Sequence, residues 1–240
     1  MEDMITEINQ GVFRLASGSK GPKEIFHNGE KLFRFMDCLY VRQEHLEDLS
    51  PLEVTNLCRA RAQYPSLIGG VNGEVKGIFS RLIHALSPSK LLEIGAGSNP
   101  VLAECPPEMN YVTSDADADA GSGDQGSLIE FSDVHSHLPY QDEFFDMIVA
   151  VFVLHFRFYQ AQVGELFRCM AKDGVFVANV YRRRQCSRME LQWGFESVGF
   201  SVVRISDPKQ LCEMHEFWVV GKDLARVSHA VGKLEKLLTI

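Results

Sequence analysis

The stretch LLEIGAGSNP, residues 91–100, is the most informative part of this chain of 240 residues. An apolar run ends at Glu93 and Ile94, and two glycines one residue apart, Gly95 and Gly97, follow directly. Glycine adopts positive φ angles and carries no side chain, so a ligand can approach the backbone closely at such a turn. The pattern predicts a buried strand that leads into a glycine-rich binding turn.

Two classes of nucleotide-like cofactor use such a turn, namely dinucleotides and S-adenosylmethionine. Gly95-Ala96-Gly97 matches the first half of the dinucleotide pattern G-x-G-x-x-G, but Pro100 stands where that pattern needs a glycine for close packing of helix on strand. Proline suits the first turn of a helix, and Asn99 suits the N-cap position before it. We therefore expect a helix to start at Asn99 and Pro100, and we disfavour a dinucleotide cofactor.

The segment Glu93-Ile94-Gly95-Ala96-Gly97 resembles the first motif of the class I S-adenosylmethionine-dependent methyltransferases. Further segments follow at the family's spacing, namely YVTSD (111–115), FSDV (131–134), LPY (138–140), FDMIV (145–149), LH (154–155), ELFR (165–168) and KDGVF (172–176). The resemblance covers about residues 75–222. Among the branches of the family, the chain most resembles the methyltransferase type 11 group, which includes small-molecule enzymes of ubiquinone biosynthesis.

The alternation of apolar runs and amphipathic segments predicts a doubly wound α/β fold. We expect strands at residues 90–94, 111–114, 128–131, 145–151, 175–180, 200–205 and 217–221, and helices at residues 74–86 and 223–238. The resemblance implies a seven-stranded, mostly parallel, Rossmann-like methyltransferase sheet whose final strand is antiparallel to its neighbours. We divide the chain into an N-terminal extension (1–72), a methyltransferase core (73–222) and a C-terminal helix (223–240).

The N-terminal extension carries mixed helical and irregular signals and no chemical motif. Residues 50–53 (SPLE) predict a capped helix start, and residues 64–70 (YPSLIGG) predict a break before the core. In the family such extensions often cover the substrate pocket, so the extension is either a substrate lid or a dimerisation segment. A homodimer is therefore one expectation for this chain.

The resemblance implies S-adenosylmethionine as methyl donor and S-adenosylhomocysteine as product. Glu93 would complement the ammonium group of the methionyl tail, and Gly95 and Gly97 would let the turn approach it. Asp115, which follows the second strand, would accept hydrogen bonds from both ribose hydroxyls, in preference to the nearby Asp117 or Asp119.

Adenine has its own expected partners, because Asp133 would accept from its amino group while the N–H of Val134 faces the ring. Four further residues complete the expected cofactor contacts, namely Ala96, Asn99, Ala116 and Val151.

Methyl transfer requires an acceptor atom held in line with the methyl group, and a base only if the acceptor must lose a proton. His155, after the fourth strand, is the candidate base, and the alternative is a histidine packed among phenylalanines. Tyr181 would face the same mouth, and Phe152 and Phe156 would shape an aromatic acceptor pocket. Arg182 would bind an acidic substrate group, although the run 182–184 also fits a solvated charged surface.

Composition excludes several other functions. The formal net charge of −8 argues against a nucleic-acid partner, because phosphate binding needs a basic face. His135 and His137 lack a third ligand, and residues 150–152 offer no acidic side chain, so we expect metal-independent transfer. The six scattered cysteines fit reduced thiols of a cytoplasmic protein. No signal-peptide pattern is seen, and the longest apolar run, 144–156, is too short to span a bilayer.

The sequence therefore predicts a methyltransferase that acts on a small molecule, with a hydroxyl of a metabolite or natural product as the favoured acceptor. Modification of RNA or protein is an alternative that would use the basic residues 182–184. A non-catalytic, cofactor-binding regulatory subunit is the other alternative, since the motifs predict cofactor binding and do not by themselves establish transfer.

Overall fold

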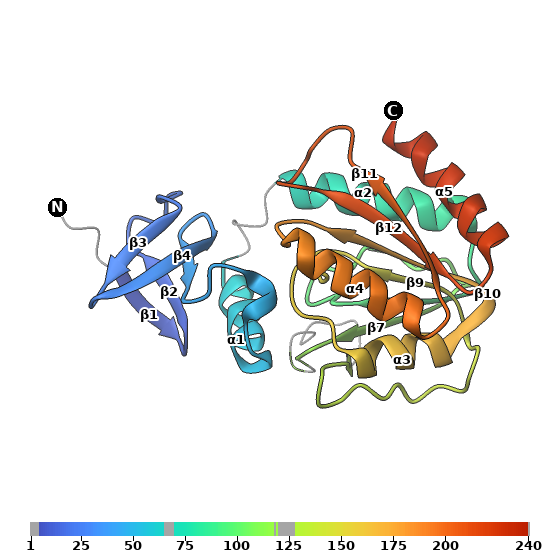
Figure 1. The fold of residues 1–240 in the computed structure, drawn as a ribbon, viewed down its shortest axis with the longest axis horizontal. Helices are drawn as coiled ribbons and strands as arrows, with labels where there is room; N and C mark the ends of the chain where they lie inside the picture. The colour runs from blue at the N-terminus through green and yellow to red at the C-terminus, as the bar shows by residue number, and fades with distance from the viewer. Residues whose placement is uncertain (1–4, 65–69, 118, 120–127, 240) are drawn as a thin grey trace. The chain divides into compact units, whose positions relative to one another are not determined.

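The computed structural model describes residues 5–64, 70–117, 119 and 128–239. It divides into two compact units, residues 1–69 and 70–240. Figure 1 shows a small β-rich unit at the N-terminal end of the chain and a larger α/β unit after it. Among the described residues, no helix combines the length and the hydropathy needed to cross a membrane.

The N-terminal unit is built on an antiparallel sheet, where the sequence had indicated mixed helical and irregular structure. The strands pair in the order β1-β2-β5-β4-β3. Asn28 and Gly29, both at positive φ, connect β3 to β4 in a two-residue hairpin turn. The bounds are β1 (Ile5–Asn9), β2 (Val12–Leu15), β3 (Glu24–His27), β4 (Glu30–Met36) and β5 (Leu39–Val41), followed by the short 3-10 helix η1 (Leu46–Asp48).

Helix α1 (Pro51–Ala62) begins where the sequence predicted. The Ser50 hydroxyl accepts a hydrogen bond from the Glu53 N–H, and the Glu53 carboxylate accepts one from the Ser50 N–H at 2.8 Å. This reciprocal pair satisfies backbone donors that a helix start leaves free, and Pro51 fits the first position because it has no N–H. The break expected at 64–70 lies largely outside the described residues, which omit 65–69.

The larger unit contains the seven-stranded sheet that the sequence predicted. Its strands run in the order β11-β12-β10-β9-β6-β7-β8, and all pairs are parallel except those that β12 makes with β10 and β11. The bounds are β6 (Lys90–Ile94), β7 (Asn110–Asp115), β8 (Ile129–Glu130), β9 (Phe145–Ala150), β10 (Met170–Val180), β11 (Ser201–Ser206) and β12 (Glu216–Gly221). This is the doubly wound methyltransferase sheet with a reversed final strand.

Helices cover both faces of this sheet (Figure 1). Successive residues of a strand point to opposite faces, so Leu91 and Leu92 of β6 enter two different apolar cores. One core includes residues of α2 (Gly70–Leu86) and α5 (Leu224–Leu238), and the other includes residues of α3 (Gln160–Cys169) and α4 (Gln185–Ser197). Burial on both faces explains why the central strands are continuous apolar runs.

The strand order reverses between β6 and β9. After β6 the chain adds β7 and then β8 toward one edge of the sheet. It then returns to β9 on the other side of β6 and adds β10 toward the opposite edge. In open α/β sheets, ligands bind beyond the carboxyl ends of the strands at such a switch point. The loops after β6, β7, β9 and β10 are therefore where a site is expected.

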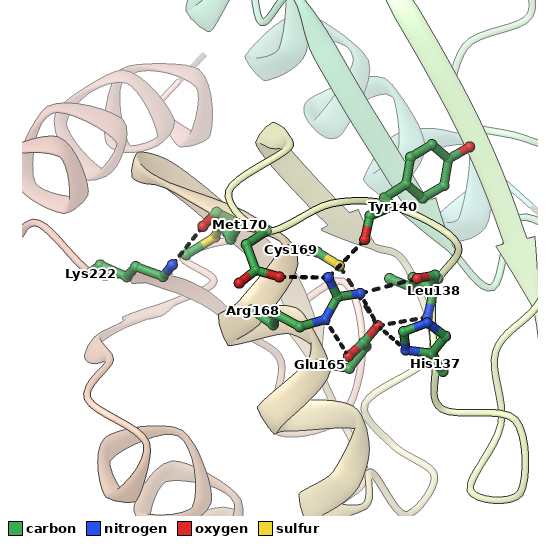
Figure 2. Close-up of polar contacts among 9 residues, drawn as sticks. His137, Leu138, Tyr140, Glu165, Arg168, Cys169, Met170 and Lys222 are labelled. Carbon is green, nitrogen blue, oxygen red and sulfur yellow. Dashed lines mark hydrogen bonds and ion pairs between the residues drawn. The ribbon is translucent and has the colours of Figure 1, made fainter.

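The connection between β8 and β9 is fastened to α3 by Arg168 (Figure 2). Its guanidinium donates to the carbonyl oxygens of Leu138 and Tyr140 at 3.1 and 2.7 Å, and to the carboxylates of Glu165 and Asp142 at 2.5 and 2.8 Å. Although burial acts to raise the pKa of Glu165, the hydrogen bonds from Arg168 and from the Leu138 N–H hold it below its usual value. The network fixes the path of the segment that follows Asp133.

Candidate functional site

The glycine turn lies at the carboxyl end of β6. Gly95 and Gly97 have φ angles of +74° and +53°, which non-glycine residues rarely adopt. The N–H groups of Gly95 and Ala96 both donate to the Ser114 carbonyl, at 2.8 and 3.1 Å, which ties the turn to β7. A Cβ atom on Gly95 would collide with the side chain of Val153, so glycine is needed there for space as well as for backbone angle.

No helix follows the glycine turn, so the expected helix start at Asn99 and Pro100 is wrong. The chain from Gly95 to Met109 is irregular before it enters β7. The N–H of Val101 donates to the Glu93 side chain at 2.9 Å within this segment. A helix that began at Pro100 would be short, because Pro106 and Pro107 follow and proline disfavours helical backbone at the residue before it.

Glu93 lies inside the fold and has two partners there. One oxygen, Oε2, accepts hydrogen bonds from the N–H of Val101 and from the hydroxyl of Tyr111. Burial raises the pKa of Glu93 above its usual value, against the opposing effect of these hydrogen bonds. In this arrangement Glu93 shapes the irregular loop that replaces the expected helix.

Asp115 ends β7 beside the glycine turn and is 8% exposed. Its Oδ2 accepts the N–H of Gly97 at 3.0 Å, and its Oδ1 accepts the N–H of Asp117 at 3.2 Å. Burial raises the pKa of this carboxyl above its usual value. Each carboxylate oxygen has two lone pairs, so both can accept a further hydrogen bond from a ligand. The structure thus brings the predicted ribose acceptor to the predicted turn.

Asp133 follows β8 in a short turn, where the N–H of Ser132 donates to the His135 carbonyl at 3.1 Å. Its Oδ1 atom is buried and accepts no hydrogen bond from any described residue. The neighbouring Val134 is 75% exposed, which is unusual for an apolar side chain. A buried oxygen without a donor is costly, so it favours a ligand that supplies one.

Four aromatic rings gather after β9 and β10. The ring of His155 lies 4.0 Å from that of Phe156 and 4.6 Å from that of Tyr181, between centroids, and Phe152 meets Tyr181 edge-on at 5.3 Å. The structure therefore brings together the residues predicted as base, second catalytic group and acceptor pocket. His155 is only 2% exposed, so it also serves as a packing residue.

The loop after β9, which carries Phe152, His155 and Phe156, is anchored by Asn179, which the sequence did not single out, and by Arg183, to which it gave another role. Asn179 of β10 accepts the Phe152 N–H at 2.7 Å through its Oδ1. Arg183 donates from one nitrogen to the carbonyls of Leu154 and Phe156 at 2.9 and 2.7 Å. Asn179 lies in an otherwise apolar strand, and that isolated polar residue is the signal that could have revealed it.

The basic run 182–184 is not a solvated charged surface throughout. Arg183 is 4% exposed, because its guanidinium points inward to the loop carbonyls. Arg182 has a φ of +48°, and its backbone N–H donates to the Glu213 carbonyl at 3.0 Å. The two histidines His135 and His137 do not share a partner. His135 contacts the Glu130 carboxylate at 3.5 Å, and His137 contacts the Glu165 carboxylate at 3.2 Å.

Residues 92–178, which contain the glycine turn and these strand ends, match the model of a family described as the methyltransferase domain. The chain carries a class I methyltransferase domain. The family uses S-adenosylmethionine as methyl donor. No significant match is found among curated protein sequences.

Solved structures of methyltransferases have similar folds at low sequence identity. The TehB-like S-adenosylmethionine-dependent methyltransferase from Corynebacterium glutamicum is 18% identical, over 72% of this chain and 100% of that one, with a TM-score of 0.48. A methyltransferase from Thermotoga maritima, described as a possible histamine N-methyltransferase, is 17% identical over 70% and 98%, with a TM-score of 0.46. The citrinin polyketide synthase CMeT domain is 12% identical over 57% and 47%, so this chain spans about half its length, with a TM-score of 0.45.

Three features of the candidate site have the chemistry that S-adenosylmethionine requires. Gly95 and Gly97 leave the backbone of the turn without side chains, Asp115 retains acceptor capacity, and Asp133 presents a buried oxygen in need of a donor. These groups would hold the methionyl tail, the ribose and the adenine respectively. The departure from the predicted pattern is the loop after Gly97, where the expected helix does not form.

Proposed function

We propose that this methyltransferase transfers the methyl group of S-adenosylmethionine to a small-molecule acceptor, with a hydroxyl oxygen as the favoured acceptor atom. The observation that carries the proposal is the convergence of polar groups at one edge of the sheet. The strand ends of β6 and β7 supply the Gly97 N–H and the Asp115 carboxylate, and the turn after β8 supplies the Asp133 oxygen. Class I family membership supports the identity of the donor.

When bound, S-adenosylmethionine supplies an electrophilic methyl group on a sulfonium. The chain's own contribution is to bind and orient the reactants, which is the largest requirement of an in-line displacement. Asp115 and Asp133 would fix the nucleoside, and the glycine turn would admit the methionyl tail. The aromatic rings of Phe152, Phe156 and Tyr181 would keep water from the reacting atoms.

The acceptor side supports a small molecule. The aromatic residues form an apolar wall at the switch point, and His155, in contact with Tyr181, is the group we assign to receive a proton from an acceptor hydroxyl. Because Arg183 is buried, the basic run offers fewer surface charges than a phosphate backbone requires. We therefore favour a small-molecule acceptor over RNA, and we assign Arg182 to an acidic group of that substrate.

The first experiment is calorimetric titration of the full chain with S-adenosylhomocysteine and, separately, with NAD. We expect micromolar binding of S-adenosylhomocysteine alone, and loss of that binding in Gly97→Val with an unchanged circular dichroism spectrum. Binding of neither ligand would contradict the proposal. If the donor binds, isotopically labelled S-adenosylmethionine offered with a hydroxylated metabolite panel and with total RNA tests the acceptor, and label found only in RNA would overturn the small-molecule assignment.

His155 has its own test within the proposed function. If it receives the proton, His155→Ala should lower turnover far more than affinity for S-adenosylhomocysteine, and should remove the acid limb of the pH–rate profile. The matched variant Phe156→Leu changes the same aromatic group without a titrating side chain. An unchanged pH profile in His155→Ala would leave His155 as a packing residue.

A further inference from the structure

A line of buried polar side chains runs from the loop between β11 and β12, through Asn179 of β10, to the loop after β9. Asp207, in the loop between β11 and β12, contacts the Nδ1 of His215 through its Oδ2 at 2.7 Å. The Nε2 of His215 lies 3.1 Å from the Nδ2 of Asn179, and the Oδ1 of Asn179 accepts the Phe152 N–H at 2.7 Å. Asp207, His215 and Asn179 are all essentially inaccessible to solvent.

The hydrogen bonds along this line allow one consistent assignment of donors and acceptors. Asn179 must present its oxygen to the Phe152 N–H, which leaves its amide NH₂ to donate to the Nε2 of His215. His215 is then neutral and donates from Nδ1 to Asp207. The N–H groups of Lys209 and Leu211 bind the two oxygens of Asp207 at 3.0 and 2.8 Å, so the far end of the line is itself fixed.

The surroundings of His215 agree with a neutral ring. Burial lowers the pKa of His215 below its usual value, and this effect outweighs the opposing influence of Asp207. The other charged groups that face the ring are Arg188 of α4 and Glu216 of β12, which act in opposite directions on its pKa. A neutral His215 is the protonation state that the hydrogen-bond directions require.

The line ends on a strained turn that touches the glycine turn. Phe152 has a φ of +59°, an uncommon angle for a residue with a bulky side chain. The next residue, Val153, occupies the space that a Cβ atom on Gly95 would need. The Asn179 bond therefore fixes the backbone from which Val153 reaches the donor-binding turn.

We propose that Asp207, His215 and Asn179 form a positioning relay that holds the Phe152–Val153 turn against Gly95 and so sets the affinity for the methyl donor. The inference rests on the proposed function, because it assigns the relay to that donor site. None of the three side chains needs to touch the donor, since each acts through the next. Asn179 stands among apolar residues in the buried stretch Val175–Val180 of β10, and burying a polar side chain there is costly unless its hydrogen bonds are satisfied. This cost indicates a requirement for the backbone position that the relay holds.

The test uses two variants at one position and a matched control. Asn179→Leu keeps the approximate volume and removes the acceptor for the Phe152 N–H, while Asn179→Asp keeps an acceptor. Asp146→Leu is the control, because Asp146 accepts the N–H groups of Ser89 and Lys90 at the opposite end of β9. The measurements are amide hydrogen exchange at Phe152, calorimetric affinity for S-adenosylhomocysteine, and thermal unfolding.

We expect Asn179→Leu to speed Phe152 exchange and to weaken S-adenosylhomocysteine binding by about tenfold or more, the effect of one lost buried hydrogen-bond partner. Asp146→Leu should lower the unfolding temperature and leave binding unchanged. In Asn179→Asp the second carboxylate oxygen faces Nε2, so the relay needs a protonated His215. Binding by that variant should therefore weaken as the pH rises, a dependence that binding by the wild type should lack.

The outcomes distinguish a failure of the relay from a failure of the proposed function. If the wild type does not bind S-adenosylhomocysteine, the proposed function fails. If the wild type binds it and Asn179→Leu binds it equally well despite faster Phe152 exchange, the proposed function stands and the relay is overturned. If Asn179→Leu does not fold, the pH dependence of Asn179→Asp decides, and a profile parallel to that of the wild type overturns the relay.

Discussion

Asp115→Asn should separate the contribution of Asp115 to ligand binding from its contribution to folding. In the wild type both oxygens of Asp115 accept a backbone N–H, and burial raises the pKa of the carboxyl. Asparagine relieves the cost of burying a charge, but its NH₂ group leaves either the Gly97 or the Asp117 N–H without an acceptor. These effects oppose each other, so we expect the free energy of unfolding to change by less than about 1 kcal/mol.

Donor binding should respond much more strongly. The two ribose hydroxyls would donate to an ionised carboxylate, and hydrogen bonds to charged groups contribute about 1.5–3 kcal/mol each. One acceptor oxygen remains in Asp115→Asn, so we expect a loss of about 2 kcal/mol, or roughly 30-fold in Kd for S-adenosylhomocysteine. Asp119→Asn, a change of the same type at an exposed residue four positions away, should change Kd by less than about twofold.

Titration calorimetry and urea unfolding of the same preparations measure both quantities. Wild-type affinity should also fall with decreasing pH at a value above the ~3.9 of a free aspartate, because the raised pKa means that Asp115 is protonated earlier. The asparagine variant should lack that dependence. An affinity for S-adenosylhomocysteine equal to that of the wild type at neutral pH would refute the ribose role of Asp115.

Three further predictions concern the frame of the site. Gly95→Ala should lower the free energy of unfolding by about 1–2 kcal/mol in urea titrations, because alanine is strained at a φ of +74° and its Cβ atom collides with the neighbouring loop. Arg183→Met should cost about 3 kcal/mol in the same assay, because two buried carbonyls lose a charged donor, and an unchanged midpoint would show that the loop is held otherwise. Although burial acts to raise the pKa of Asp207, its hydrogen bond with His215 lowers it below the usual value, so this pair stabilises the fold above about pH 4 and the stability is lost as the pH falls through the lowered pKa. Asp207→Asn should therefore show a shallower loss of stability on acidification, measured by urea unfolding at a series of pH values, and parallel curves would contradict this.

Local sequence signals were sufficient for the strands of the larger unit and for its helices α2 and α5. Continuous apolar runs marked the core strands because both faces of the sheet are covered, and burial on both faces requires apolar residues at every position. The capped start of α1 could also be predicted from the sequence. The side chains of Ser50 and Glu53 each accept the backbone N–H of the other residue, so no distant residue is needed. The Asn28-Gly29 turn is a hairpin signal in the sequence, but the strands on either side of it were missed because most of their residues are partly or fully exposed and give no apolar run.

The helix expected after the glycine turn shows where local reasoning failed. Asn99 and Pro100 suit a helix start, but the chain stays irregular there, and the Glu93 side chain binds the Val101 N–H from inside the fold. That contact joins residues eight apart through a buried carboxylate, and no capping rule contains it. Arg183 was misjudged for the same reason, because its charge suggested solvent while its partners are carbonyls of another loop.

The sequence by itself determined the fold class, the glycine turn and the acidic residues at the strand ends, because periodicity and motif spacing act over a few neighbouring residues. Only the tertiary structure decided which of those groups are already partnered and which have acceptor capacity left for a ligand. It also decided that Asn179, His215 and Asp207 form one line, since β10 and β12 are paired in the sheet but separated by 35 residues of chain between Val180 and Glu216. Hydrogen bonds between such segments depend on packing, and packing is a property of the whole core.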